Sequence, residues 1–443
     1  MTPKKIKLRE NVNFYYYPEN RFSNNNLCVE FLRPLEKSEC ASLELISMLL
    51  RRGGTNKYPD IASLSKAKEE NYDCSAGTGV VRDANLTGLG FSVSWLDGSF
   101  VPDGTDTEEG ALDILAQIML CPKTENGAFP TESLEREKKN LCDKIRSLIN
   151  NRERYASTKC REMMYENDPY GAPSFGCEED VAAADAKGLF ALYRQIIGCC
   201  PINVFYIGHA AEEKAKKSVE ALLMPILDFP RDDYPAQINE EIAPIAKEKS
   251  ASVKMSGSQS ILCLGLKTPI TSQNDDFLAH KLCWAILSGS SINKFYRRVR
   301  EAYSLCYFCY GATDALKGAV IVSTGINACD RELAEEKIRE QIEDMKIGNI
   351  SEEEFEAGKK ALRSGLRETN DSLFATENYY IRRIRASLPI DVSPEMMMEK
   401  LEALTVSDVM RAAIAMKYDS VFFLEGDGIE EDDESESEGE DDE

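Results

Sequence analysis

The sequence repeats one order of predicted elements, strand, helix, turn, helix and strand, in its two halves. In the first half these elements are expected at 27–31, 41–50, 61–70 and 86–95. In the second half they are expected at 261–265, at about 275–287, before Arg300, and from Tyr307 to Thr324. Cys28 and Cys263 occupy equivalent places in the two copies, 235 residues apart. The chain is therefore expected to fold as two similar domains.

The later parts of the two halves also match each other. A helical segment at 131–141 parallels another at 352–362, and the pattern Ser351-x-x-Glu354 predicts a capping box at the start of the second segment. Closing strands are expected at 204–207 and 421–424. Both copies are thus predicted to end in the same way.

The repeat sets the expected domain boundaries. A chain of 443 residues exceeds what a single hydrophobic core usually supports. The first domain is expected at 1–227 and the second at 248–427. Residues 228–247 contain three prolines and many charges, which predicts a linker, and residues 428–443 are expected to be a disordered acidic tail.

Charge and composition exclude several classes of partner. The formal net charge is −23, and 430–443 alone holds 11 acidic residues in 14 positions, which is typical of a solubility tail. Phosphate-binding surfaces are basic, so neither nucleic acid nor an anionic membrane is expected as a partner. No run of 18 apolar residues predicts a membrane span, and the first residues lack the apolar region of a secretion signal. The 14 scattered cysteines fit reduced thiols, so we expect a cytoplasmic protein.

The stretch from Leu287 to Tyr310 contains the main candidate site residues. Arg300 ends a helical segment and Tyr307 begins an aromatic strand seven residues later. A short connection of this kind brings a guanidinium and a phenol to one rim, where they can hold a peptide carbonyl and the charge it develops when attacked. The alternative is that Arg300 is one of three surface arginines, with Arg297 and Arg298, and that Tyr307 is an ordinary strand residue.

The sequence predicts no metal site. Its only histidines are His209 and His280, so no two histidines can bind a metal from one helix. His209 follows an apolar strand and is interpreted as a strand-end residue. The thiols of Cys306-x-x-Cys309 would point to opposite faces of a strand, so neither zinc binding nor redox use is expected there.

Several motifs resemble those of the insulinase (pitrilysin) family of zinc metallopeptidases, in its short two-domain form. Residues 167–176, NDPYGAPSFG, are similar to the family's His-Pro-Tyr-Gly-x-Pro-x-x-Gly stretch. The turn at Gly289-Ser290 and the pair Arg300 and Tyr307 resemble the family's glycine turn and its arginine/tyrosine pair. The resemblance covers the chain except for the acidic tail. It implies an α+β fold of two homologous α/β-sandwich domains, each a mostly antiparallel sheet with helices on one face, forming half of a clamshell.

The zinc-binding motif of this family is absent. Active members carry H-x-x-E-H on the first helix, where two histidines hold zinc and the glutamate takes a proton from bound water. This motif aligns with residues 43–47, so Leu43, Ile46 and Ser47 take the places of the ligands and the base. Lys144 takes the place of the downstream carboxylate ligand. The resemblance therefore implies a degenerate zinc site that binds no metal or other cofactor.

Family members of this kind work in pairs, in which one chain provides zinc and the other provides the arginine and tyrosine. The resemblance thus implies the non-metal-binding subunit of a heterodimeric insulinase-type metallopeptidase, inactive alone. Arg300 and Tyr307 would be catalytic, Gly289 and Ser290 would bind the peptide substrate, and a paralogous chain with an intact H-x-x-E-H would hold the zinc.

The alternative is a catalytically inert structural or peptide-binding protein with a retired peptidase fold. The Gly289 turn is then simply the end of a helix, which needs no substrate. An independent peptidase is disfavoured, because the sequence shows no substitute nucleophile and base.

Overall fold

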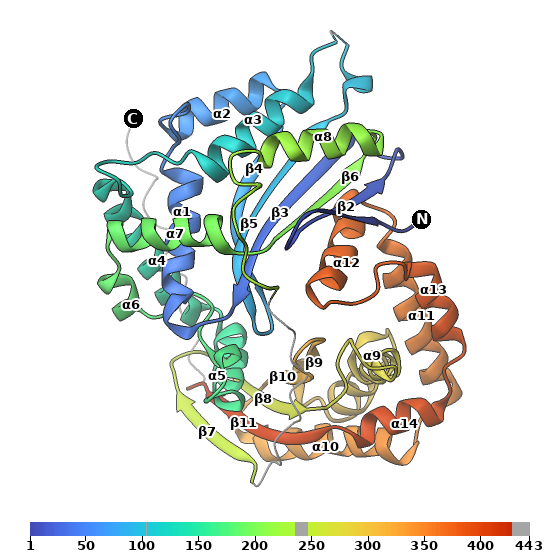
Figure 1. The fold of residues 1–443 in the computed structure, drawn as a ribbon. Coiled ribbons are helices and arrows are strands. Elements are labelled where there is room, and N and C mark those ends of the chain that lie inside the picture. Colours follow the sequence, from blue (N-terminus) through green and yellow to red (C-terminus); the bar gives the residue numbers. More distant parts are fainter. Residues whose placement is uncertain (103, 235–246, 428–443) are drawn as a thin grey trace, which may run out of the picture. The chain divides into compact units, whose positions relative to one another are not determined.

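The computed structural model describes residues 1–102, 104–234 and 247–427. The chain forms two compact units, each built around one sheet (Figure 1). Unit 1 comprises Met1–Ser147, Tyr165–Glu240 and Arg363–Lys400, and unit 2 comprises Leu148–Met164, Glu241–Leu362 and Leu401–Glu443. The proposed acidic tail and most of the proposed linker lie outside the described residues, so the domain boundaries expected from the sequence stay predictions.

The sheet of unit 1 has the order β1-β2-β6-β3-β5-β4, in which β2 and β6 are parallel and the other neighbours antiparallel. Its strands are β1 (Lys4–Arg9), β2 (Val12–Pro18), β3 (Asn24–Pro34), β4 (Ser75–Asp83), β5 (Leu86–Leu96) and β6 (Ile202–Gly208). The strands expected at 27–31, 86–95 and 204–207 lie within β3, β5 and β6.

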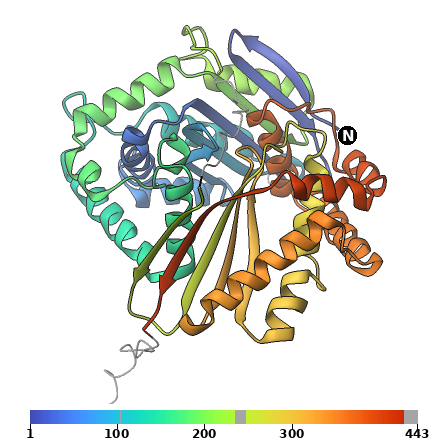
Figure 2. The same cartoon turned by 90° about the horizontal axis from the view of Figure 1, so that it is seen from below.

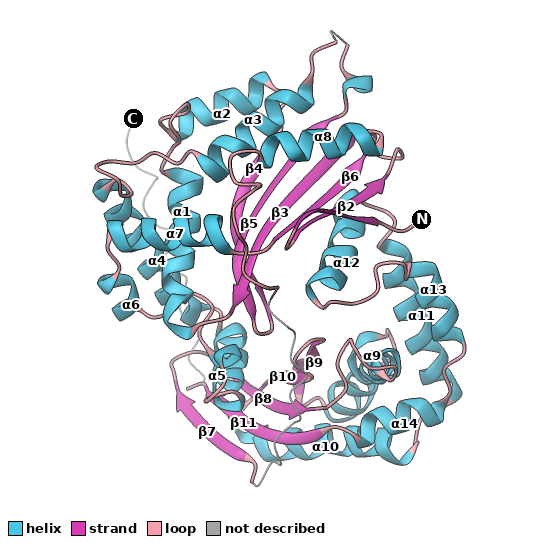
Figure 3. Ribbon diagram, viewed as in Figure 1, coloured by secondary structure: helices cyan, strands magenta, loops and turns pink. Residues whose placement is uncertain are grey.

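The sheet of unit 2 repeats this topology without a counterpart of β1 among the described strands. Its order is β7-β11-β8-β10-β9, and only β7 and β11 are parallel (Figures 2 and 3). Its strands are β7 (Lys249–Lys254), β8 (Ser260–Lys267), β9 (Cys306–Asp314), β10 (Ala319–Ile326) and β11 (Lys417–Glu425). The expected fold class, two similar domains with mostly antiparallel sheets, is confirmed.

The register of the sheets supports the equivalence of Cys28 and Cys263. Cys28 lies opposite Ser92 on one side and Phe205 on the other. Cys263 likewise lies between Ser323 and Phe422. The repeat therefore extends to single positions of the two sheets.

Helices pack on the sheets of both units. Unit 1 contains α1 (Cys40–Arg52), α2 (Ile61–Glu70), α3 (Thr107–Leu120), α4 (Thr131–Ser147), α6 (Glu178–Ala183), α7 (Ala186–Cys199), α8 (Glu212–Leu223) and α12 (Leu373–Arg385). Unit 2 contains α5 (Arg152–Met164), α9 (Phe277–Trp284), α10 (Arg331–Ile347) and α14 (Val406–Ile414). The chain passes between the units within α11 (Glu352–Glu368) and α13 (Pro394–Glu402).

Two successive helices, α4 and α5, recur as α11 and α12 exactly 221 residues later and with the same lengths. The predicted capping box of α11 is present. The Ser351 N–H donates to Glu354 Oε2 at 3.0 Å, and the Glu354 N–H donates to Ser351 Oγ at 3.2 Å. Asn151 and Ser372 accept backbone hydrogen bonds at the starts of α5 and α12. The same local signals therefore start the equivalent helices.

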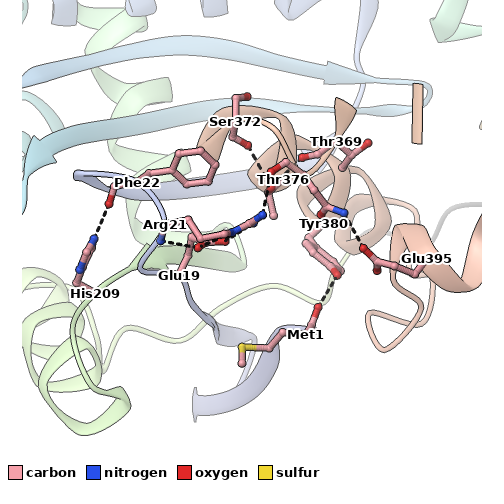
Figure 4. Close-up of polar contacts among 11 residues, drawn as sticks. Met1, Glu19, Arg21, Phe22, His209, Thr369, Ser372, Thr376, Tyr380 and Glu395 are labelled. Atoms are coloured by element: carbon pink, nitrogen blue, oxygen red, sulfur yellow. Dashed lines mark hydrogen bonds and ion pairs between the residues drawn. The ribbon is translucent and has the colours of Figure 1, made fainter. Parts of the chain in front are cut away.

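Helix α5 comes from the first half of the chain but packs in unit 2, which the second half mainly forms. Helix α12 comes from the second half but packs in unit 1, which the first half mainly forms. Helix α12 packs against β3 and β6, and α5 packs against β8, β10 and β11. Two hydrogen bonds hold α12 and the residues before it within unit 1: the Tyr380 hydroxyl donates to the Met1 carbonyl at 3.1 Å, and Arg21 donates to the Asn370 carbonyl at 3.2 Å (Figure 4). Helices cover one face of the unit 1 sheet, as expected, and α12 covers part of the other face as well, so β6 is buried along its whole length.

An ion pair fixes α12 to the sheet of unit 1. The Arg385 guanidinium donates to both carboxylate oxygens of Glu30, and its Nη1 lies 3.7 Å from Asp83 Oδ2. Burial opposes the charge of Arg385, but the Glu30 carboxylate outweighs it and raises the pKa of Arg385. The repeat places Gly265 and Met164 at the equivalent positions of unit 2, where Met164 Sδ fills the space beside Gly265. At this position, an ion pair joins helix and sheet in unit 1, whereas apolar packing joins them in unit 2.

Glu377, one helical turn from Ile381 on α12, is buried, and among the described residues no cation pairs with it. It accepts a hydrogen bond from Asn26 at 3.2 Å, and within the described parts of the chain its Oε1 has no hydrogen-bond partner. Burial raises its pKa to about 7, while the Asn26 bond lowers the pKa and the charge of Glu30 raises it. A cavity of about 10 Å³ lies between α12 and the strands β3 and β6, with room for at most one water molecule. Its lining residues are Cys28, Glu30, Asn203, Phe205, Ile381 and Ile384.

Glu377 should make the stability of the protein depend on pH. Its carboxyl is protonated up to about pH 7 in the fold but ionises from about pH 4.5 in the unfolded chain. The folded state therefore holds the extra proton, and this contribution to the free energy of unfolding is lost as the pH rises from 4.5 to 7, by about 3 kcal/mol. In urea unfolding across this range, Glu377→Gln should gain about that much relative to the wild type. The exposed Glu132→Gln should show a constant difference, and a constant difference for Glu377→Gln would contradict the prediction.

Candidate active-site rim

Tyr307 lies in β9, the edge strand of the unit 2 sheet, at a β-bulge. Strand β9 pairs with β10 regularly from Asp314 to Phe308, after which the register shifts so that Cys306 faces Ile326. Tyr307 has no opposite residue, and its side chain is 63% exposed. Bulges commonly redirect a side chain at the edge of a sheet. Tyr307 is thus presented to solvent by a local irregularity of the backbone.

Arg300 lies just before this strand, in a π-helical turn at Tyr296–Glu301 that packs against β9. Its guanidinium carbon lies 5.5 Å from the centre of the Tyr296 ring, a favourable cation–π distance. The Ser304 N–H donates to the Arg300 carbonyl at 2.8 Å, which closes the connection to β9. Burial raises the pKa of the Cys306 thiol, and the positive charge of Arg300 opposes part of this rise. Both predicted catalytic residues therefore lie exposed on adjoining elements of one unit.

The turn at Gly289 also follows a π-helical segment, Ala285–Gly289. A Cβ at Gly289 would meet only ordinary contacts, the nearest being Ala285 Cβ at 3.6 Å, so local packing does not require glycine. The Ser290 N–H donates to the Ala285 carbonyl at 2.8 Å, and Ser290 is 5% exposed with an unpartnered Oγ. The turn ends a helix, as the alternative interpretation expects, and substrate binding by Gly289 and Ser290 stays a prediction.

The positions aligned with the zinc motif lie in α1 and are filled by packed side chains. Leu43, Ile46 and Ser47 are at most 4% exposed. Lys144, on the neighbouring helix α4, places its ammonium 3.4 Å from Glu44 Oε2 and 3.7 Å from the centre of the Phe175 ring. Two aliphatic side chains, a hydroxyl and an ammonium do not fit a zinc ion. Lys144 instead makes an internal ion pair at this place in unit 1.

The two histidines are used by the fold. His209 follows β6, where its N–H donates to Asn25 Oδ1 at 2.7 Å. Its Nε2 lies 2.5 Å from the Phe22 carbonyl oxygen (Figure 4). His280 is buried in α9, and burial lowers its pKa to about 4. Over the described residues, no three histidine, cysteine or acidic side chains are grouped so that they could hold a metal ion.

One polar contact near the rim has no signal in the sequence. The Tyr310 hydroxyl, three residues after Tyr307, donates to Glu153 of α5. Burial and this hydrogen bond raise the pKa of Tyr310. Phe308 lies beside it, with ring centres 5.9 Å apart, on the face of the sheet covered by α5. Tyr310 and Glu153 are 157 positions apart in the sequence. They meet because α5, which belongs to the first half of the chain, packs in unit 2.

Comparisons with known proteins agree with the fold. Residues 202–362 match the family model described as Peptidase M16 inactive domain. A curated protein of Bacillus subtilis (strain 168), "Probable inactive metalloprotease YmfF", is 26% identical over 409 residues, which cover 92% of this chain and 94% of that protein.

Solved structures share the architecture along nearly the whole chain. A conserved protein from Enterococcus faecalis V583 has a TM-score of 0.87 at 24% identity, covering 97% of this chain and 100% of that one. A peptidase M16 inactive domain from Pseudomonas fluorescens has a TM-score of 0.79 at 18% identity, covering 97% and 99%. Identities this low show the fold alone.

Within 1–102, 104–234 and 247–427, none of the helices combines the length and apolar character that crossing a lipid bilayer requires. The family match over residues 202–362, the curated relative and the repeated fold confirm the resemblance of this chain to the M16, or insulinase-type, metallopeptidases.

Proposed function

We propose that this chain is the zinc-free subunit of a heterodimeric insulinase-type peptidase that acts on peptides in the cytoplasm. The proposal rests on one contrast. An arginine and a tyrosine are exposed on adjoining elements of unit 2, whereas the positions aligned with the zinc motif are filled by buried side chains. Arg300 and Tyr307 both reach solvent beside an edge strand, while Leu43 and Ile46 are fully buried. The chain retains groups that hold a carbonyl but lacks groups that hold a catalytic metal.

The rim residues suit the chemistry of peptide-bond attack. The phenol of Tyr307 can donate a hydrogen bond to a substrate carbonyl oxygen, and the guanidinium of Arg300 can stabilise the negative charge that this oxygen develops. The edge strand β9 can accept an extended peptide as an added strand, which aligns the scissile bond along the rim. The zinc of the partner chain would supply the activated water.

Peptide hydrolysis measured with each chain alone and with both mixed tests the proposal. The partner to use is a chain of similar length from the same genome with an intact H-x-x-E-H. Activity should occur only in the mixture, since each chain contributes half of the site. Hydrolysis by the partner alone at the rate of the mixture would contradict it.

A catalytically inert peptide-binding protein is the second candidate, because the β9 edge can bind an extended peptide without any zinc-bearing partner. It predicts peptide binding by this chain alone and no change in peptide hydrolysis when the two chains are mixed.

A further inference from the structure

Two buried side chains of unit 1, Glu377 on α12 and Asn26 on β3, share one hydrogen bond and leave two oxygen atoms over. Asn26 Nδ2 donates to Glu377 Oε2 at 3.2 Å. Over the residues that the structure describes, the buried atoms Glu377 Oε1 and Asn26 Oδ1 make no hydrogen bond. With an ionised carboxyl both atoms are acceptors, so neither can satisfy the other. Two buried acceptors without a donor destabilise the fold.

A single proton satisfies both oxygen atoms. A protonated carboxyl has one O–H donor, and a primary amide has a carbonyl acceptor next to its N–H₂ donor. With the proton on Glu377 Oε1, this O–H can donate to Asn26 Oδ1. The existing bond from Asn26 Nδ2 to Glu377 Oε2 then completes a ring of two hydrogen bonds between a neutral acid and an amide.

The charges around Glu377 favour its neutral form as well. Glu30 is 3% exposed, and its negative charge acts on Glu377. The nearby cation, Arg385, already donates to both carboxylate oxygens of Glu30. The packed part of β6 contributes the uncharged Asn203, Phe205 and Ile207. The other titratable groups of this region are Cys28 on β3, Tyr15 and Tyr17 on β2, Asp83 on β4, Tyr380 on α12, and Tyr234. None of these groups can supply a second positive charge.

We infer that Glu377 and Asn26 form a proton-dependent contact that holds α12 on the sheet of unit 1. With the proton bound, the acid and the amide join the helix to β3. When the proton leaves, this pair is lost and a second carboxylate is buried beside Glu30, so α12 separates from β3 and β6 more often. The ion pair of Arg385 and the apolar side chains of α12 still hold the helix most of the time. The contact does not depend on peptide hydrolysis by any complex.

The contact should weaken as the pH rises towards 7. Burial, together with the charge of Glu30, raises the pKa of Glu377 to about 7 while α12 is docked, whereas a separated helix exposes the carboxyl and returns its pKa to 4.5. The docked form therefore keeps a proton that the separated form loses between these pH values. The population of the separated form should rise about 50-fold to 100-fold from about pH 5 to about pH 8, and change little above that.

Chemical labelling of Cys28 tests the inference. This thiol lines the small cavity between α12 and the sheet, so a reagent reaches it when α12 separates. Labelling by iodoacetamide is followed by peptide mass spectrometry in the wild type and in Glu377→Gln, whose amide can pair with Asn26 at every pH. The ratio of the two Cys28 rates at each pH cancels the pH dependence of the thiol itself. This ratio should rise about 50-fold to 100-fold between about pH 5 and about pH 8.

Cys263 provides a matched control in unit 2. It takes the place of Cys28 in the repeat, and the buried Ala156 and Ile261 take the places of Glu377 and Asn26. The ratio for Cys263 should therefore stay constant with pH. A constant ratio for Cys28 would overturn the inference. Equal rises for Cys28 and Cys263 would show unfolding of the whole chain rather than movement of α12, and would also overturn it.

Infrared spectroscopy locates the proton without relying on any movement. The difference spectrum between the wild type and Glu377→Gln at about pH 6 should contain the carbonyl stretch of a protonated carboxylic acid, and this band should be lost above about pH 8. A difference spectrum with only the bands of an ionised carboxylate at the lower pH would show that Glu377 is charged in the fold, against the inference.

Discussion

Replacing Arg385 with methionine should lower the free energy of unfolding by about 3–5 kcal/mol. The guanidinium is the cation that compensates Glu30, which is 3% exposed, and it also lies beside Asp83. Removing it leaves the Glu30 carboxylate buried without its counter-charge under α12. Urea unfolding monitored by circular dichroism measures the change. The exposed Arg382→Met on the same helix should change stability by no more than about 0.5 kcal/mol.

The equivalent positions of unit 2 suggest how to restore the stability that Arg385→Met loses. At the equivalent positions, unit 2 packs Met164 against Gly265 and needs no ion pair. The double variant Glu30→Met with Arg385→Met should therefore recover most of the stability that Arg385→Met loses, because both charges leave the interior together. If the double variant is no more stable than Arg385→Met, the prediction is wrong, and the ion pair contributes more to stability than the mutual compensation of its two charges.

Replacing Arg300 with alanine should reduce peptide hydrolysis by the mixed complex about 100-fold to 1,000-fold. The guanidinium is proposed to stabilise the oxyanion, whose charge develops only in the transition state, so the loss should fall mainly on kcat. Tyr307→Phe should also lower kcat, since it removes a single hydroxyl donor. Steady-state hydrolysis of a fluorogenic peptide by the mixture gives both constants.

Neighbouring residues of the same type provide controls for these variants. Arg298 is an exposed arginine of the same π-helical turn, and Tyr303 is a 50% exposed tyrosine in the connection to β9. Arg298→Ala and Tyr303→Phe should leave kcat within about twofold of the wild type. If Arg300→Ala also retains full activity in the mixture, the assignment of the rim residues is wrong.

The sequence predicted the elements whose signals are local. Alternating and helical spacing of apolar residues indicated β3, β5, β8 and α1, and the capping box at Ser351 and Glu354 has the hydrogen bonds expected of it. The duplicated pattern also indicated equivalent strands, which the matching neighbours of Cys28 and Cys263 confirm. These features depend on residues within a few positions of one another or on comparison of the two halves.

Features set by distant contacts could not be read from the sequence. The helix expected at about 275–287 is present as α9, but it continues as a π-helical turn at Ala285–Gly289, and the segment that contains Arg300 is π-helical as well. The bulge at Tyr307 depends on the pairing of β9 with β10, which a strand pattern does not specify. Likewise, Glu377 has an ordinary helical position, and only the packing of α12 on β3 raises its pKa. The sequence named Arg300 and Tyr307 but not the backbone irregularities that expose them.

The placement of α5 and α12 determines the smallest part of this chain that can fold. A chain divided between the two repeats would give two fragments. In each fragment one face of the sheet would lose its covering helix, and one helix would have no sheet to pack on. The apolar strands β6 and β8 would then meet water along one face. Each half on its own is therefore expected to be less stable than the whole chain.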